Sequence, residues 1–563
     1  MSAVLTYNLP MLAGAPNGIK KLRELILELA VRGKLVPQDA DDEPASELLK
    51  RIAVEKEKLS PKVKKTSAIS VRARAFELPE SWRWASFGDI AQHNSGKTLD
   101  KGRNSGVPRD YITTSNLYWG KFELSGVRQM LIEEKDLARC TAIMSDLLIC
   151  EGGEAGRAAV WDQEREICFQ NHVHRARFFC GINPHYVQRC FERLNYSGEI
   201  AEYRKGVGIS NMSSKSLASI PVPLPPITEQ HRIVAKVDEL MALCDRLEAR
   251  QADSDSAHAQ LVQALLGSLT QASDAEDFAQ SWQRLVEHFH ALLTTESSID
   301  ALKQTLLQLA VMGKLVPQDP SDEPACKLLG RISTGKAELV RAGILKAPKP
   351  LPSIKQDEIP YTLPLSWQWV RLGEISEFIN GDRGKNYPNR SEYVLEGIPW
   401  INTGHIEPDG TLSQDSMNFI TRDKFESLNG GKIRIGDLVY CLRGATFGKT
   451  AIVDPFSEGA IASSLMIIRP FEPCSNRYMY RYLISQIGRD QIFRFDNGSA
   501  QPNLSANNVR LYVYPLPPLA EQHRIVSKLD QLMALCDRLK ARLSQARQVH
   551  EHLASALVEQ AVA

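Results

Sequence analysis

Several residues have types and spacing that could do chemistry, but each pattern is incomplete. Gly444 to Thr450 reads GATFGKT, one spacer residue short of the G-x-x-x-x-G-K-[ST] loop that cradles nucleotide phosphates. No later strand with an acidic, metal-holding residue is evident. We interpret the stretch as a basic, glycine-bearing surface loop. The alternative is a self-sufficient nuclease or NTPase that uses this loop and therefore binds ATP.

Histidines and cysteines also stop short of a metal or nucleophile site. His172 and His174 alternate as on a strand, but no Cys/His/Asp cluster at zinc spacing accompanies them, so we expect a polar strand face. The ten cysteines are never spaced C-x-x-C, which favours reduced thiols. Neither a G-x-S-x-G elbow nor a methyltransferase signature of a glycine-rich S-adenosylmethionine loop or a base-flipping tetrad is found. The sequence therefore predicts a binding protein with no catalytic, cofactor-binding or metal-binding residues.

The composition further limits the class of protein to which the chain can belong. The chain is 43% hydrophobic and 24% charged, and no run approaches the ~18 apolar residues that a membrane helix needs. The N-terminus lacks the basic and apolar regions of a signal peptide, so we expect a cytoplasmic protein. With a net charge of +1, any nucleic-acid contact must use local basic residues or a partner's charges.

The elements that position these residues occur twice. PLPPITEQHRIVAKVDELMALCDRLEAR at 223–250 returns as PLPPLAEQHRIVSKLDQLMALCDRLKAR at 515–542. Steps of four and three continue beyond each copy and predict a coiled-coil seam on a long helix. The central seam is Ile233, Val237, Leu240, Cys244, Leu247, Gln251, Ser254, His258, Leu261 and Leu265. The C-terminal seam is Ile525, Leu529, Leu532, Cys536, Leu539, Leu543, Ala546, His550, Leu553 and Leu557. We interpret the two histidines as polar interruptions that set the register.

A shorter helical unit is also repeated. An apolar stripe predicts a helix over 19–32, and Asp42 is expected to cap a second helix with Pro44 in its first turn. The same unit returns at 299–332. We expect the central long helix to pair with the unit that follows it. The C-terminal long helix would then pair with the N-terminal unit.

Each short-helix unit leads through a linker into a larger domain. The domains open with LPESWRWASFGDI at 78–90 and LPLSWQWVRLGEI at 363–375, whose tryptophans (Trp82, Trp84, Trp367 and Trp369) are expected in the core. Alternating runs predict strands over 141–150 and 432–441. We expect an α+β fold, in which long antiparallel helical coiled-coil spacers separate two mixed α/β domains, with pseudo-two-fold symmetry and a circular arrangement of repeats. The predicted parts are 1–77, the N-terminal unit and linker; 78–225, the first domain; 226–362, the central spacer; 363–517, the second domain; and 518–563, the C-terminal helix.

These residues resemble the DNA specificity subunit of type I restriction-modification systems. The resemblance rests on the W-x-W-x-x-x-G-[DE]-I openings, the strand-end S/G-D-L segments, the N-[ML]-S closings and the P-L-P-P-x-x-E-Q-H-R-I-V helix starts, and it covers nearly the whole chain. It implies that each domain is a target recognition domain for one half of an asymmetric, bipartite double-stranded DNA site. The spacers would fix the half-site separation.

The resemblance also implies partners. The spacers would dock two adenine-N6 methyltransferase (modification) subunits, and restriction/translocase subunits would join them. S-adenosylmethionine, ATP and Mg²⁺ would be held by those partners, not by this chain. The second alternative is a coiled-coil scaffold whose domains bind protein rather than DNA.

Candidate DNA-binding residues follow from the chemistry of base and phosphate contacts, because Arg and Lys suit guanine and phosphate whereas Asn and Gln suit adenine. In the first domain they are Lys97, Arg103, Thr114, Asn116, Arg157, Gln170, Asn171, His172, Lys205, Ser210 and Asn211. In the second domain they are Arg383, Lys385, Asn402, Thr403, His405, Arg443, Thr446, Lys449, Ser463, Gln501 and Asn503. For subunit docking and the coiled-coil seam we predict Ile233, Val237, Leu240, Cys244 and Leu247, with Ile525, Leu529, Leu532, Cys536 and Leu539.

Overall fold

The protein is described by a computed structural model covering residues 11–59, 76–98, 100, 102, 104–205, 210–273, 275–347, 349–443, 446–495 and 504–562. These residues form two compact units. Unit 1 comprises the described parts of Met1–Asp255 and Gln545–Ala563, and unit 2 comprises those of Ser256–Ser544. Two long helices, α8 (Ile227–Gln271) and α18 (Leu519–Val562), contribute residues to both units. Within the described ranges, no helix has the length and apolar character needed to cross a membrane.

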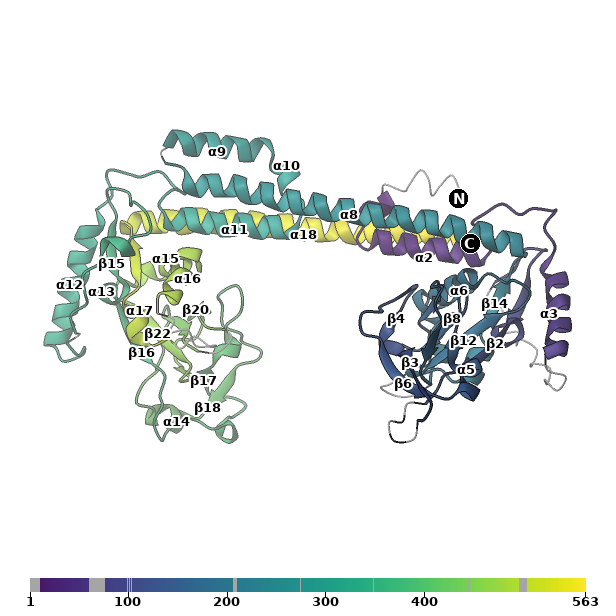
Figure 1. Cartoon of the computed structure of the whole chain (residues 1–563). Helices are drawn as coiled ribbons and strands as arrows, with labels where there is room; N and C mark the ends of the chain where they lie inside the picture. The colour runs from purple at the N-terminus through teal and green to yellow at the C-terminus, as the bar shows by residue number, and fades with distance from the viewer. Residues whose placement is uncertain are drawn as a thin grey trace. The chain divides into compact units, whose positions relative to one another are not determined.

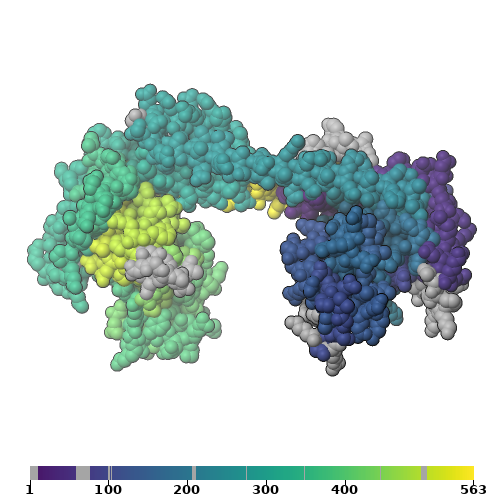
Figure 2. Space-filling model, viewed as in Figure 1, coloured from purple at the N-terminus to yellow at the C-terminus, as the bar shows by residue number. Residues whose placement is uncertain are grey.

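Unit 1 combines helices with a mixed domain (Figure 1). Its further helices are α2 (Gly18–Val31), α3 (Ala45–Leu59), α4 (Phe87–Ile90), α5 (Glu134–Cys140), α6 (Pro184–Tyr196) and α7 (Ser214–Ala218). Its strands are β1 (Arg83–Ser86), β2 (Ala91–Ser95), β3 (Val107–Ile112), β4 (Leu117–Tyr118), β5 (Lys121–Phe122), β6 (Arg128–Ile132), β7 (Thr141–Ala142), β8 (Leu147–Cys150), β9 (Gly152–Gly153), β10 (Ala158–Val160), β11 (Ile167–Phe169), β12 (Val173–Phe178), β13 (Ser210–Asn211) and β14 (Pro221–Leu224). Helix α3 lies on the outside of this unit, in purple in Figure 2.

Unit 2 repeats the plan. Its further helices are α9 (Ala275–Glu287), α10 (Phe289–Leu292), α11 (Glu296–Val311), α12 (Ala325–Arg341), α13 (Leu372–Ile375), α14 (Arg422–Ser427), α15 (Asn476–Ile484), α16 (Gln486–Phe493) and α17 (Ala506–Arg510). Its strands are β15 (Gln368–Arg371), β16 (Ser376–Asn380), β17 (Ile398–Ile401), β18 (Asn418–Ile420), β19 (Leu438–Cys441), β20 (Thr450–Ile452), β21 (Ala460–Ile461), β22 (Leu465–Pro470) and β23 (Val513–Leu516).

The two mixed domains share one topology despite their different sequences. A four-stranded antiparallel sheet has the order β10-β8-β12-β2 in unit 1 and β20-β19-β22-β16 in unit 2. A second sheet has the order β6-β3-β11 and continues to β7; its counterpart is β18-β17-β21. In each second sheet the middle strand pairs parallel with one neighbour and antiparallel with the other. The α+β fold predicted from the sequence is therefore confirmed.

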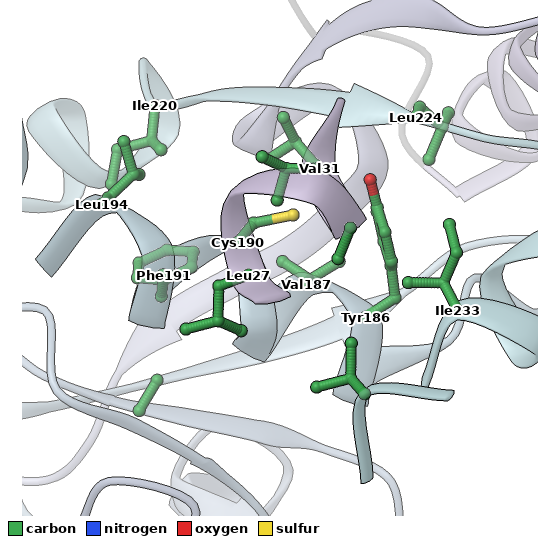
Figure 3. Close-up of a cluster of buried hydrophobic side chains, with 14 of the residues drawn as sticks. Leu27, Val31, Tyr186, Val187, Cys190, Phe191, Leu194, Ile220, Leu224 and Ile233 are labelled. Carbon is green, nitrogen blue, oxygen red and sulfur yellow. The ribbon is translucent and has the colours of Figure 1, made fainter. Parts of the chain in front are cut away.

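Helix α2 packs on the mixed domain of unit 1 through one apolar core. Leu27 and Val31 of α2 meet Val187 and Phe191 of α6, and Ile233 of α8 joins the same cluster (Figure 3). Helix α6 forms because Asn183 caps it, Pro184 opens it, and its apolar residues recur at helical spacing. The short-helix unit therefore connects the mixed domain to the long helix.

The short-helix units contact both long helices. Lys21 donates a hydrogen bond to Ser555 of α18 at 2.7 Å, and Arg23 pairs with Asp245 of α8. In unit 2, Lys303 of α11 pairs with Asp537 of α18. The sequence predicted that each short-helix unit pairs with one long helix. In the structure, residues of both long helices are buried in the core of each unit, so each short-helix unit packs with two long helices.

The predicted cap of the second helix is wrong. Helix α3 begins at Ala45, directly after Pro44, and Asp42 accepts instead from Arg232 and Thr228 in the first turns of α8. Asp322 accepts from Arg524 in the same way in unit 2. Since a guanidinium makes two charge-assisted hydrogen bonds, it binds the aspartate carboxylate in preference to the backbone N–H groups at the start of the short helix.

The heptad seam holds only for the first half of each long helix. Ile233, Val237, Leu240 and Cys244 are buried, as are Ile525, Leu529 and Cys536; Leu247, Leu532 and Leu539 are half-buried. Beyond them, Gln251, Ser254, Leu261, Ala546, His550 and Leu553 are exposed, His258, Leu265, Leu543 and Leu557 are half-buried, and Val262 and Ala554 are buried instead. Val262 follows Cys244, and Ala554 follows Cys536, by five turns of an ordinary 3.6-residue helix, from which a strict heptad drifts. The predicted continuation of the seam is therefore wrong.

The expected strands are shorter than predicted. The run at 141–150 divides into β7 and β8, because Ser145 turns the chain with a φ of 73°. In the run at 432–441 only Leu438–Cys441 pairs as a strand.

Candidate nucleic-acid interface

One edge of the first mixed domain gathers several of the predicted DNA-binding residues that the structure describes. Strands β3 and β11 run parallel, so both end at this edge, and β2 turns toward it at Gly96. A Cβ on Gly96 would lie 2.0 Å from the carbonyl oxygen of Phe169, so only glycine fits the crossing. The second mixed domain repeats this approach, since a Cβ on Gly381 would lie 2.4 Å from the oxygen of Ala462.

Backbone hydrogen bonds connect the loops at this edge. The amide of Lys97 donates to Phe169, and the amide of Asn171 donates back to Lys97 at 2.9 Å. Gln170 donates to Ile112, which brings the turn containing Thr114 into the same group. The carbonyl of His172 accepts from Glu151, whose own carbonyl accepts from Met212. The neighbouring Asn211 pairs with Lys205 in both directions, at 2.8 and 2.9 Å.

The second mixed domain brings a different set of side chains to the equivalent edge. Arg383 follows β16, Asn402 follows β17, and Ser463 follows β21. The guanidinium of Arg383 reaches the carbonyl of Ser463 at 3.5 Å, and Ala462 donates to Ile401 at 2.8 Å. Arg443 follows β19 and is exposed, while Lys449 donates to Ile406 at 3.5 Å. One shared topology thus presents two chemically different edges.

Some predicted residues have their polar atoms engaged inside the chain. Asn116 is buried, accepts from Thr113 and donates to Glu123. Arg157 donates to Thr114 at 2.7 Å and pairs with Glu154 at 3.0 Å, and Lys97 pairs with Asp136. These bonds give the three side chains an internal structural role.

His405 is held in the same way. Its Nδ1 accepts from the Asn402 amide at 3.1 Å, and its Nε2 lies 3.3 Å from Asn418 Nδ2. Burial lowers the pKa of the His405 imidazole, so the ring is neutral at pH 7 and brings no positive charge to the edge.

Other predicted residues present solvent-accessible surface. Exposed or half-buried members in the first domain are Thr114, Gln170, Asn171, His172, Lys205 and Asn211; those in the second are Arg383, Lys385, Asn402, Thr403, Arg443, Thr446, Lys449 and Ser463. Ser210 belongs to β13, but its side chain lies outside the described part of the chain, as do Arg103, Gln501 and Asn503 entirely.

Arg139 was missed by sequence reasoning. It is exposed at the end of α5 and donates to the carbonyl of Ser95 at 3.3 Å, directly beside Gly96 and Lys97. A basic residue in the last turn of a short helix is an ordinary feature of helix ends, so the sequence offered no signal that distinguished it.

The metal and nucleotide alternatives gain no support. Among the described residues, no group of three or more His, Cys, Asp or Glu side chains could hold a metal. His174 is buried, with Nε2 3.1 Å from the carbonyl oxygen of Met212, so the polar strand face predicted for it is wrong. Gly444 and Ala445 of the GATFGKT stretch lie outside the described residues, and the Lys449 ammonium bonds to a backbone carbonyl.

The E-Q-H-R stretch that starts each long helix has an internal role that the sequence did not reveal. Glu229 is buried and accepts from Trp82 Nε1 at 2.9 Å and from Gln38 at 2.6 Å. Burial raises the pKa of this carboxyl, while the two donors oppose that rise. The predicted core position of Trp82 is confirmed by its burial.

Unit 2 builds the same junction with the same chemistry. Glu521 accepts from Trp367 Nε1 at 2.9 Å and from Gln318 at 2.6 Å, and burial raises its pKa. Near-identity of the two helix starts therefore has an intrachain cause, since each start must lock the same tryptophan and glutamine in place.

One set of exposed residues on the repeated helices forms a flank that occurs twice. Leu243, Arg246 and Arg250 recur at steps of three and four on α8, and Leu535, Arg538 and Arg542 occupy the matching positions of α18. All are exposed except Leu243, which is half-buried. We call these two triplets the repeated flank, since the same three residue types occur on both helices.

Comparisons with known proteins agree on one family. A model described as the type I restriction modification DNA specificity domain matches residues 79–254 and 364–546. The type I restriction enzyme EcoAI specificity subunit of Escherichia coli is 37% identical, over 97% of this chain and 94% of its own length. The EcoEI specificity subunit of the same species is also 37% identical, with the same coverage. A solved chain, titled for complex assembly and conformational transition of the type I R-M system, shares the fold with a TM-score of 0.50 and 19% identity, over 86% of this chain and 99% of that one.

Proposed function

Because the chain belongs to the family of type I restriction-modification DNA specificity subunits, we propose that each of its mixed domains reads one half of an asymmetric, bipartite DNA site. The observation that carries this proposal is that both mixed domains have an equivalent edge lined by polar side chains. Loops after equivalent strands gather Asn, Gln, Arg and Lys side chains in both domains, yet with different residues in each. Asn and Gln suit adenine, and Arg and Lys suit guanine and phosphate. Two edges with different side chains should therefore select two different half-site sequences, which we call words.

The side chains we assign to DNA are those that the chain leaves accessible. In the first domain, Gln170, Asn171 and His172 follow β11 and Lys205 faces solvent, and Arg139 adds positive charge beside them. In the second domain, Arg383, Asn402 and Arg443 each follow a different strand of the fold. Lys97, Asn116, Arg157 and His405 shape the edges rather than read bases, because each side chain already bonds to partners inside the chain.

The long helices serve the other half of the function. We propose that α8 and α18 set the number of unread base pairs between the two words and dock two modification subunits. The buried seam residues stabilise the chain itself, so docking uses the repeated flank, which offers the same Leu, Arg and Arg twice. Two identical partners need two similar surfaces, and Arg is enriched in protein interfaces. The modification subunits would hold S-adenosylmethionine, restriction/translocase subunits would use ATP and Mg²⁺, and the complex would act in the cytoplasm.

A binding selection tests the reading of DNA. The chain, co-purified with its modification subunit, is incubated with random-sequence duplexes, and the bound duplexes are sequenced. We expect two short words separated by a constant unread gap. Arg443→Ala should relax the second word and spare the first, whereas Arg422→Ala, whose side chain pairs with Glu458, serves as the matched control. Recovery of unselected sequences, or ATP binding by the isolated chain, would contradict the proposal.

A further inference from the structure

A pair of cysteines lies inside the first mixed domain, beside the edge assigned to DNA. Cys140 is the last residue of α5, and Cys168 is the middle residue of β11. Both belong to one small apolar cluster with Tyr111 and Met130. Cys168 is the register partner of Thr141, the residue after Cys140, and its sulfur lies 3.6 Å from the Thr141 hydroxyl oxygen. Two thiols from separate segments of the chain therefore share one site.

A hydrogen bond between the two sulfur atoms makes the thiols chemically unequal. The Cys140 thiol donates to Cys168, which lowers the pKa of the Cys168 thiol despite its burial and raises the pKa of Cys140. The Thr141 hydroxyl and the nearby Arg109 also favour the Cys168 thiolate. The thiolate is the nucleophilic form of cysteine. Cys168 therefore has the character of an attacking sulfur, and Cys140 that of the second thiol that completes a disulfide.

The surroundings of the pair select the oxidant. Neither thiol is more than 4% exposed, which excludes a bulky reagent. The site nevertheless lies just below the surface, because Arg139 is exposed and Thr141 is half-buried. A peroxide is small enough to enter. Two other buried cysteines of this domain are less reactive, since burial raises the pKa of Cys150 to about 11 and that of Cys190 to about 12.

The backbone connects both cysteines to the edge assigned to DNA. Strand β11 continues from Cys168 directly into the loop of residues 170–172. The end of α5 is attached to the end of β2, because Arg139, next to Cys140, donates to the carbonyl of Ser95 at 3.3 Å. A disulfide holds two sulfur atoms closer together than a hydrogen bond between thiols does. Forming it would therefore shift the loop after β11 relative to the end of β2.

The second mixed domain has no thiol at the equivalent positions. The bridge between Lys432 and Ala460 matches the pairing of β7 with β11, so Ala460 occupies the position of Cys168. Gly431, the residue before Lys432, occupies the position of Cys140. Oxidation at this place in the fold can therefore act on the first domain alone.

We propose that Cys140 and Cys168 form a peroxide-sensitive pair, whose disulfide weakens the reading of the first word and spares the second. This inference rests on the proposed DNA-reading function and adds its regulation. The Cys168 thiolate attacks one oxygen of hydrogen peroxide and becomes a sulfenic acid, while the other oxygen leaves and takes up a proton as water. The Cys140 sulfur then displaces the sulfenic hydroxyl, which leaves with the Cys140 proton as a second water. Two thiols and one peroxide thus give one disulfide and two waters.

Treatment of the complex of the full chain and its modification subunit with hydrogen peroxide tests the pair. Peptide mapping by mass spectrometry without reduction should find a crosslink between Cys140 and Cys168. Fragmentation of the crosslinked peptides separates Cys140 from Cys150, which lies on the same tryptic peptide. Affinity for a duplex with both words should fall about tenfold, the scale of one lost base contact, and dithiothreitol should restore it. In a binding selection, the oxidised complex should relax the first word and keep the second.

Cysteine variants show whether the pair causes the loss of affinity. Cys168→Ala, which copies the residue of the second domain, and Cys140→Ala should each bind DNA like the reduced wild type and ignore peroxide. Cys326→Ser, at an exposed thiol of unit 2, is the matched control and should keep both the crosslink and the loss of affinity.

Three results would overturn the inference. They are the absence of the crosslink in the treated wild type, a crosslinked complex that still reads the first word normally, and an equal loss of affinity in treated Cys168→Ala. If the reduced wild type failed to select two words, the proposed DNA-reading function itself would be refuted, so the two failures are distinguishable.

Discussion

The tryptophan–glutamate junction offers a sharp test of how the long helices are anchored. In unit 2, Trp367→Phe keeps an aromatic ring but removes the N–H that donates to Glu521 at 2.9 Å. Glu521 is fully buried, so its carboxylate would keep only Gln318 as a side-chain donor. Loss of a hydrogen bond to a buried charged group costs about 1.5–3 kcal/mol. For a unit of this size, a loss of about 2 kcal/mol lowers the Tm by roughly 4–8 °C.

Thermal unfolding followed by circular dichroism at 222 nm measures this shift. Trp82→Phe should produce a similar loss in unit 1, because Glu229 has the same two donors. Trp369→Phe is the matched control, since Trp369 is half-exposed and packs on Tyr361 at 5.0 Å rather than on a buried carboxylate. A Tm unchanged within about one degree in both junction variants, or an equal loss in the control, would refute the assigned role.

Three further outcomes follow from the same contacts. Burial raises the pKa of the Glu521 carboxyl in the folded chain above the ordinary 4.5, so protonation of this carboxyl stabilises the fold below pH 4.5. This stabilisation is lost as the pH rises through the folded pKa. In unfolding scans at pH 4.5–7, the wild type should therefore lose stability with rising pH relative to Glu521→Gln. A difference in stability between the two proteins that does not change with pH would contradict this expectation. Arg443→Ala should lower affinity for cognate DNA by about tenfold, with assembly unchanged in mobility-shift and mass measurements, and loss of subunits with normal DNA binding would reverse the assignment. Leu243→Asp combined with Leu535→Asp should prevent partner docking while the Tm stays within about 2 °C, and an intact complex would exclude the repeated flank.

Much of the fold was predictable because the sequence repeats itself. Two copies of the long helix start, the short-helix unit and the W-x-W opening predicted two similar units, and the buried Trp82 and Trp367 agree with that prediction. The seam was predictable only as far as Cys244 and Cys536. Beyond these residues the helix continues at its own 3.6-residue period, so the side chains that face a core no longer match a heptad.

The candidate site was predictable as loops but not as individual side chains. Residue type alone cannot show that Arg157 is held by Thr114 and Glu154, because these partners come from separate segments. The near-identity of the helix starts was likewise open to two explanations. Docking of two identical partners and hydrogen bonding within the chain both require repeated residues. The burial of Glu229 and Glu521 shows that much of the repetition maintains contacts within the chain.

The most direct test of the central claim is a map of methylated adenines in cells that co-express this chain with its modification subunit. We expect one asymmetric motif, in which two different half-site sequences flank a constant number of unread base pairs. Replacing residues 363–517 with the second domain of a relative should change one word and leave the other. A continuous or symmetric motif, or a change in both words after the exchange, would contradict the claim that the two domains read DNA separately.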